Sequence, residues 1–129
     1  MTSINTQKPL AKTIQCINPA TLAAPGGHYS HAVIANGHVF VSGQLQITSS
    51  GKKLNQASFD AQARQVLSNV EAALEAAGTG VTQLVQVRVY VTDSVHWPAF
   101  NQIYAKWGGR QPTSERGGAG AHVAPWFSD

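Results

Sequence analysis

The sequence predicts an α+β domain in which two helices cover one face of a mixed β-sheet, and three observations carry this prediction. A hairpin signal lies in the first third of the chain, a helical apolar stripe fills the middle, and an alternating valine segment precedes a second apolar helix. Helices gathered on one face of a sheet form the two layers of such a fold. The 129 residues suffice for a single domain, over residues 1–129, and are too few for two.

The hairpin is the most specific of the strand signals. Two apolar-rich runs, Ser30–Ala35 and His38–Leu45, are joined by Asn-Gly at positions 36–37, the dipeptide that best tolerates the two positive φ angles of a type I′ turn. Gly43 inside the second run indicates a bulge or a close approach to the backbone. The short run Ile14–Ile17 predicts a further strand before the hairpin.

The middle of the chain predicts a helix over Ser58–Ala77, with Ser58 as its N-cap and Gly78 as its terminator. The apolar residues recur at three- and four-residue steps and form one stripe: Phe59, Ala63, Val66, Leu67, Val70, Leu74 and Ala77.

Two more elements follow this helix. Between Val85 and Val91 valines alternate with other residues, which predicts a strand with one buried face. A second helix, capped by Asp93 or Ser94, then carries four apolar side chains at helical spacing: Phe100, Ile103, Tyr104 and Trp107. Residues 1–12 form a flexible polar arm in this interpretation, and residues 108–129 are an atypical glycine-rich tail without a strand or helix period.

Composition and charge narrow the possible partners. The nine Lys and Arg residues are scattered, whereas a nucleic-acid groove needs them clustered, so the net charge of +3 argues against nucleic-acid binding. Only 12% of residues are charged, which favours a surface partly covered by subunit contacts. The single cysteine, Cys16, excludes an internal disulfide, and we expect it to be buried. Without a membrane span or signal peptide pattern, a cytoplasmic location with no membrane partner is expected.

Most familiar catalytic patterns are missing. His28 and His31 lie three apart at a loop-to-strand junction, where that spacing does not place both on one face, so no metal site is predicted. Ser42-Gly43-Gln44 is not a nucleophile elbow. The candidates that remain are Tyr29, the strand Phe40–Gln44, and Asn101, which follows Phe100 on the second helix and is expected to be partly buried. A packing or capping role is the alternative for Tyr29 and Asn101.

Five stretches of the chain resemble the RidA/YjgF family of reactive-intermediate deaminases. They are INPATLAAPGGHYSHAV, VFVSGQL, FDAQARQVLSNVEAALEAAG, VQVRVYVTD and FNQIYAKW, in the family's order and spacing over residues 15–107. The resemblance implies a chorismate-mutase-like subunit that assembles into a barrel-like homotrimer with ligand clefts between subunits. It also implies hydrolysis of enamine or imine acids such as 2-aminoacrylate, 2-iminopropanoate or 2-iminobutanoate to a keto acid and ammonia, with no cofactor or metal.

The resemblance also assigns residues to the site. Tyr29 and Asn101 match the family's catalytic positions, while Ser42 and Gly43 match the hairpin strand whose backbone approaches the ligand. The family binds the substrate carboxylate with an arginine two residues after a proline, because a guanidinium binds a planar carboxylate through two hydrogen bonds. In this chain Ser114 occupies that position, and Arg116 is the nearest candidate for carboxylate binding.

The departure at Ser114 suggests a hypothesis for the tail. Codons compatible with residues 114–129 permit, in a shifted frame, an arginine directly after Pro112-Thr113 and then a valine-rich strand. The tail would then arise from a frameshift, which sequencing of the source gene tests.

Three functions therefore remain open. The first is an enamine/imine deaminase. The second is a non-catalytic oligomer that binds small carboxylates or proteins through the same cleft. The third is an endoribonuclease or translation-inhibitor role of the L-PSP type, against which the scattered basic residues argue.

Overall fold

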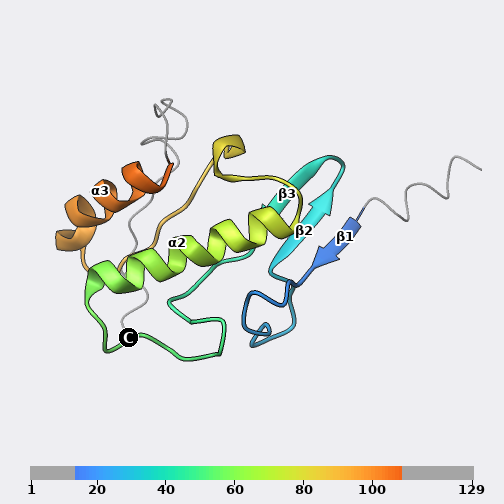
Figure 1. The fold of residues 1–129 in the computed structure, drawn as a ribbon. Coiled ribbons are helices and arrows are strands. Elements are labelled where there is room, and N and C mark those ends of the chain that lie inside the picture. Colours follow the sequence, from blue (N-terminus) through green and yellow to red (C-terminus); the bar gives the residue numbers. More distant parts are fainter. Residues whose placement is uncertain (1–13, 109–129) are drawn as a thin grey trace, which may run out of the picture.

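A long helix connects two packed regions in the computed structural model, which describes residues 14–108. Helix α2 (Phe59–Ala76) has a three-stranded sheet at its C-terminal end, and α3 (Trp97–Gly108) packs at its N-terminal end (Figure 1). The expected two-layer α+β arrangement is therefore present. The arm at residues 1–12, all of the tail beyond residue 108 and the candidate Arg116 lie outside the described residues.

The described sheet is antiparallel, with strand order β1-β2-β3. Its strands are β1 (Ile14–Ile17), β2 (Ala32–Ala35) and β3 (His38–Val41). Asn36 has φ 53° and Gly37 has φ 80°, so the turn signal in the sequence is confirmed. Both hairpin strands are shorter than their apolar runs predict, since residues 30–31 and 42–45 lie outside the strands. The Ser42 N–H still donates to the His31 carbonyl, and the Ser42 hydroxyl donates to the Ser30 carbonyl.

Helix α2 begins where its capping residue predicts. The Oγ of Ser58 accepts a hydrogen bond from the Ala61 N–H at 3.2 Å, and Gly78 adopts the left-handed conformation, φ 88°, just after the helix. The described helices include none with the length and apolar character that crossing a membrane requires.

The apolar stripe of α2 packs into two separate clusters. Towards its N-terminus, Ala63 and Leu67 pack with Phe100 and Tyr104 of α3. Towards its C-terminus, the fully buried Ala73 packs on the helix-facing side of the sheet. One helix thus supports both regions, and its placement against the hairpin decides where the loops around the hairpin lie.

Asn69 holds α2 against the segment that follows β3. Its side chain is 5% exposed, and its amide donates hydrogen bonds of 2.9 Å to the carbonyl oxygens of both Leu45 and Ile47. Its Oδ1 accepts a third bond from Gln65. A buried amide that makes three hydrogen bonds contributes to stability because each carbonyl it reaches would otherwise be desolvated without a donor.

The predicted strand over Val85–Val91 is the main difference from the sequence interpretation. The segment is extended, and its burial alternates as expected: Val87 and Val89 pack on the cluster around Phe100, and Val91 is buried. However, Val85–Val89 make no backbone hydrogen bond to any other part of residues 14–108. The valine pattern specifies the extended conformation and the buried face, but a strand also needs a hydrogen-bonded neighbour.

A 3-10 turn leads into α3. The carboxylate of Asp93 accepts a hydrogen bond from the Val95 N–H at 3.0 Å, and the turn Ser94–His96 passes directly into the helix. The expectation that Asn101 is partly buried is wrong. The buried side of α3 runs through Phe100 and Tyr104, and Asn101, one position beyond Phe100, is rotated out of this stripe and is exposed.

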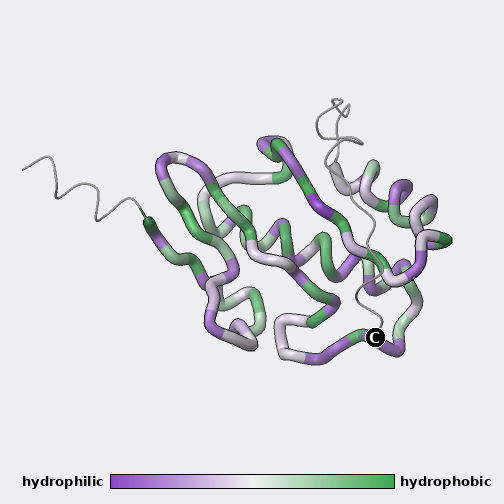
Figure 2. Tube along the Cα trace, turned by 180° about the vertical axis from the view of Figure 1, so that it is seen from behind, coloured by the Kyte–Doolittle hydropathy of each residue, from purple (hydrophilic) through white to green (hydrophobic). Residues whose placement is uncertain are grey.

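The face of the sheet that points away from α2, called the far face below, is apolar and is not covered by the described helices. Cys16, Val33 and Phe40 are cross-strand neighbours on this face, and Phe40 is 60% exposed. Figure 2, seen from behind, shows hydrophobic residues along these strands. The expectation of a buried Cys16 is wrong for the same reason: its side chain faces away from α2 and is exposed.

Replacing Asn69 with leucine should lower the free energy of unfolding by about 2–3 kcal/mol, because the carbonyls of Leu45 and Ile47 lose a buried donor. Urea denaturation followed by tryptophan fluorescence measures the loss. The exposed Asn101 gives the matched control, and Asn101→Leu should change stability by less than about 0.5 kcal/mol. Equal, small losses in the two variants would contradict the role assigned to Asn69.

Candidate functional site

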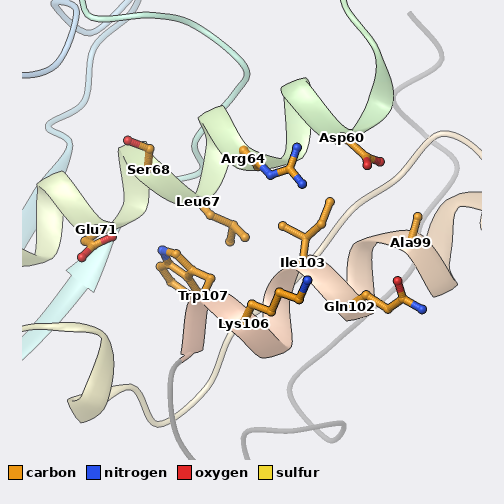
Figure 3. A pocket seen from close by; sticks show the side chains of 10 residues that line it. All are labelled: Asp60, Arg64, Leu67, Ser68, Glu71, Ala99, Gln102, Ile103, Lys106 and Trp107. Carbon is orange, nitrogen blue, oxygen red and sulfur yellow. The ribbon is translucent and has the colours of Figure 1, made fainter.

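Two hollows on the surface of the described residues are candidates for a functional site. The larger, of about 410 Å³, lies between α2 and α3 and is lined by residues of both charges, including Asp60, Arg64, Glu71 and Lys106 (Figure 3). The smaller, of about 190 Å³, lies beside the hairpin and contains Tyr29 and Gly43. We assign the site to the smaller hollow, because hydrogen bonds fix its polar groups, whereas no ion pair within residues 14–108 fixes the charges of the larger one.

Three chain segments build the smaller hollow. The loop before β2 supplies Leu22–Ala24, Gly26, Tyr29 and His31, and the segment after β3 supplies Gly43–Leu45 and Ile47. Asn69 of α2 closes the hollow between them. The two buried polar residues of the described chain, His31 and Asn69, both line it.

The loop before β2 is held to the strand after it. The Ser42 hydroxyl donates to the Ser30 carbonyl at 2.6 Å, and the Ser42 N–H donates to the His31 carbonyl at 2.9 Å. The Oδ1 of Asn18 accepts from the His31 N–H at 2.8 Å. Ser42, predicted to bind substrate, thus lies directly behind the hollow and uses its hydroxyl to hold the loop.

His31 connects both sides of the hollow through its ring. It is 7% exposed, with Nε2 2.6 Å from the Ala23 carbonyl oxygen and Nδ1 3.2 Å from the Gln44 amide nitrogen. Since a carbonyl can only accept, Nε2 carries a proton. Nδ1 then accepts from the Gln44 amide, which also donates to the Ser42 carbonyl at 3.1 Å. In this network the Nε2 of His31 is the donor and the Nδ1 is the acceptor.

Tyr29 lies at the rim of the hollow. Its ring meets the His31 ring edge-on, with centroids 6.1 Å apart and planes at 77°. Its N–H bonds to the Gly27 carbonyl in a tight turn, and the side chain remains 46% exposed. The ring is thus oriented by His31 while much of its surface is left accessible.

Gly43 presents backbone to the hollow. Among the described residues, a Cβ added there would meet no atom within 4 Å, so this part of the chain does not require glycine. The close approach predicted from the sequence would therefore have to come from outside the described residues, such as from a ligand or another subunit.

The predicted residues are only partly brought together. Tyr29 and Gly43 line one hollow with Ser42 behind them, but Asn101 is on α3 and lines neither hollow. His31 and Asn69 also line this hollow but were not among the predicted site residues, and Gln44 was named only as part of the strand Phe40–Gln44. The register set by the Asn-Gly turn was a usable signal for His31, because it places His31 opposite Ser42, next to Gln44.

The chemistry available in the hollow is that of neutral donors and acceptors. Its lining includes the Tyr29 side chain, the Gly43 backbone and apolar side chains such as Leu22 and Ile47, but no charged side chain of the described chain. Residues 14–108 contain no group of three or more His, Cys, Asp or Glu arranged to hold a metal ion.

The fold is that of a known protein class. Residues 20–119 match the family model described as endoribonuclease L-PSP, so the chain belongs to that family. It is 36% identical over 84 residues to protein HMF1 of Saccharomyces cerevisiae, covering 65% of this chain and 64% of that protein. It is 33% identical over 96 residues to a RutC family protein of Synechocystis, covering 74% of each.

Solved structures confirm the RidA/YjgF fold. RidA from the Antarctic bacterium Psychrobacter superimposes with a TM-score of 0.74 at 29% identity, covering 86% of each chain. E. coli TdcF, solved with bound serine, gives a TM-score of 0.73 at 26% identity, again covering 86% of each chain. The family resemblance and the fold expected from it are therefore both confirmed.

Proposed function

We propose that this chain hydrolyses small 2-imino or 2-enamino acids at the hollow formed by Tyr29, His31 and Gly43, as part of a homotrimer. The observation that carries the proposal is the geometry of this hollow in a chain of this family: the hydrogen-bonded His31 ring lies beside a glycine backbone and contacts a tyrosine at the rim. The related TdcF holds serine, an amino acid of similar size to the proposed substrates.

The reaction requires water to add to a C=N carbon. A 2-enamino acid first becomes the 2-imino acid by gaining a proton at Cβ and losing one from nitrogen. The water oxygen then forms a bond to the imine carbon while a proton passes from the water to the nitrogen, and the resulting carbinolamine loses ammonia to leave the keto acid. In this proposal the Tyr29 hydroxyl orients the imine nitrogen or the attacking water, and the Gly43 N–H binds the substrate. Both are neutral groups, so they position the reactants without supplying charge.

The homotrimer is supported by surfaces that one chain leaves uncovered. The sheet exposes an apolar row on its far face, and Gly43 is open to a second molecule. Burying the exposed ring of Phe40 against another subunit would contribute about 1.5–3 kcal/mol per site. A neighbouring subunit would also deepen the hollow and could supply Asn101 or a cation to it.

A non-catalytic carboxylate-binding role is the second candidate. The specific observation in its favour is that no arginine or lysine of the described chain lines the hollow. Without a cation a carboxylate is held less firmly, so binding can persist at a level that does not support catalysis.

Tyr29→Phe should lower the rate of ammonia release from 2-aminoacrylate, generated in situ by a dehydratase, by about tenfold, equivalent to one lost hydrogen bond. The substitution keeps the ring that contacts His31 and removes only the hydroxyl. Tyr90→Phe is the matched control and should keep the parent rate. If the parent protein releases no more ammonia than a buffer blank but still binds serine, the binding role replaces the catalytic one.

Phe40→Asp should convert a trimer into monomers, because it places a carboxylate in the apolar row of the far sheet face. Light scattering coupled to size exclusion measures the mass. Val95, 69% exposed at the turn before α3, provides the control, and Val95→Asp should leave the mass unchanged. A monomeric parent protein would contradict the proposed assembly.

A further inference from the structure

Among residues 14–108, strand β3 has no hydrogen-bonded neighbour on its outer edge. The hairpin closes at Ala35 and His38 and pairs Val33 with Phe40, so the N–H and C=O groups of His38, Phe40 and Ser42 point towards β2. Those of Val39, Val41 and Gly43 point away from β2. Within residues 14–108 these three residues have no backbone hydrogen-bond partner on that side.

The extended segment Val85–Val89 lies on the other side of the space next to this edge of β3, and it too has no strand partner among the described residues. Figure 1 shows the extended segment Val85–Val89 running in the same direction as β3, and α2 connects the two along the chain and packs against both. A strand, a helix and a second parallel extended segment form the usual crossover unit of a parallel sheet. Here the two segments make no hydrogen bond to each other.

The side of α2 that faces this space is apolar and incompletely covered. Val66 and Val70 lie on the helix stripe between the two core clusters, and both remain half-buried. They belong to the buried core of neither cluster. An apolar side chain placed over them would complete the stripe.

Arg88 places a positive charge on the side of the Val85–Val89 segment that faces away from the core. Its neighbours Val87 and Val89 pack on the core, so alternation directs Arg88 to the other side, where it is exposed. No carboxylate within the described chain forms an ion pair with it. A strand added next to this segment would place every second side chain beside Arg88.

We propose that the space between β3 and Val85–Val89 binds one extended peptide strand of a partner protein. The strand would hydrogen-bond to Val39 and Val41, place β-branched side chains over Val66 and Val70, and set a carboxylate beside Arg88. Backbone pairing gives affinity in such strand addition, and alternate side chains give specificity. The chain's own residues 109–129 do not show β-branched residues alternating with other residues, as this strand requires, and they contain Pro112 and Pro125. We therefore assign the strand to a partner protein. This proposal does not depend on the proposed enzymatic function.

The test uses the full chain and a fluorescein-labelled nonapeptide in which valine alternates with threonine, with one central glutamate in place of a threonine. Fluorescence anisotropy should show saturable binding at one peptide per chain. N-methylation of alternate backbone amides on the edge that pairs with β3 should weaken binding at least about tenfold, because several hydrogen bonds are lost. Replacing the glutamate with lysine should weaken it up to about fivefold, as expected for an exposed ion pair.

Charge reversal provides the matched variants. Arg88→Glu should prefer the lysine peptide over the glutamate peptide, while Arg64→Glu, an exposed arginine of α2 in the other hollow, should keep the parent preference. If Arg88→Glu does not fold, the N-methylated and lysine peptides on the parent chain still decide the question. Absence of saturable binding, or binding insensitive to N-methylation, would overturn the proposal. So would concentration-dependent self-association that excludes the peptide, because the occupant would then be a second copy.

Discussion

The two hydrogen bonds from the Asn69 amide to the carbonyls of Leu45 and Ile47 determine how α2 lies against the hairpin. That contact joins the helix carrying both core clusters to the segment that leaves β3. With α2 in place, its C-terminal half covers the sheet and its N-terminal half receives α3. The hollow beside the hairpin forms where these parts meet, and Asn69 is itself one of its walls. Stability and the site therefore depend on the same side chain.

The site is constrained by backbone and neutral side chains. His31 spans the hollow by donating to the Ala23 carbonyl and accepting from Gln44, and it meets the Tyr29 ring edge-on. This arrangement orients a tyrosine and a glycine backbone within a fold that the family shares. It does not include a charged group from residues 14–108, so firm carboxylate binding in the proposed reaction requires a cation from a neighbouring subunit or from outside the described residues.

Local signals in the sequence predicted local structure well. The Asn-Gly turn, the Ser58 cap and the α2 stripe all appear as expected, because neighbouring residues determine them. The valine alternation also predicted the extended backbone and buried face of Val85–Val89, but not its missing partner, since strand pairing depends on a distant segment. The exposure of Cys16 and Asn101 was missed because burial depends on which face another element covers. His31 and Gln44 meet only through the hairpin register.

Within residues 14–108, strand β3 is paired on one side and open on the other, and amide hydrogen exchange measured by NMR tests this residue by residue. We expect the amides of Phe40 and Ser42, whose N–H groups point to β2, to exchange at least about a hundredfold more slowly than those of Val39, Val41 and Gly43. The same experiment should find the amides of Val87 and Val89 exchanging quickly. Strong protection at Val39, Val41 and Gly43 in the isolated chain would contradict the account, because that edge of the sheet would then be paired.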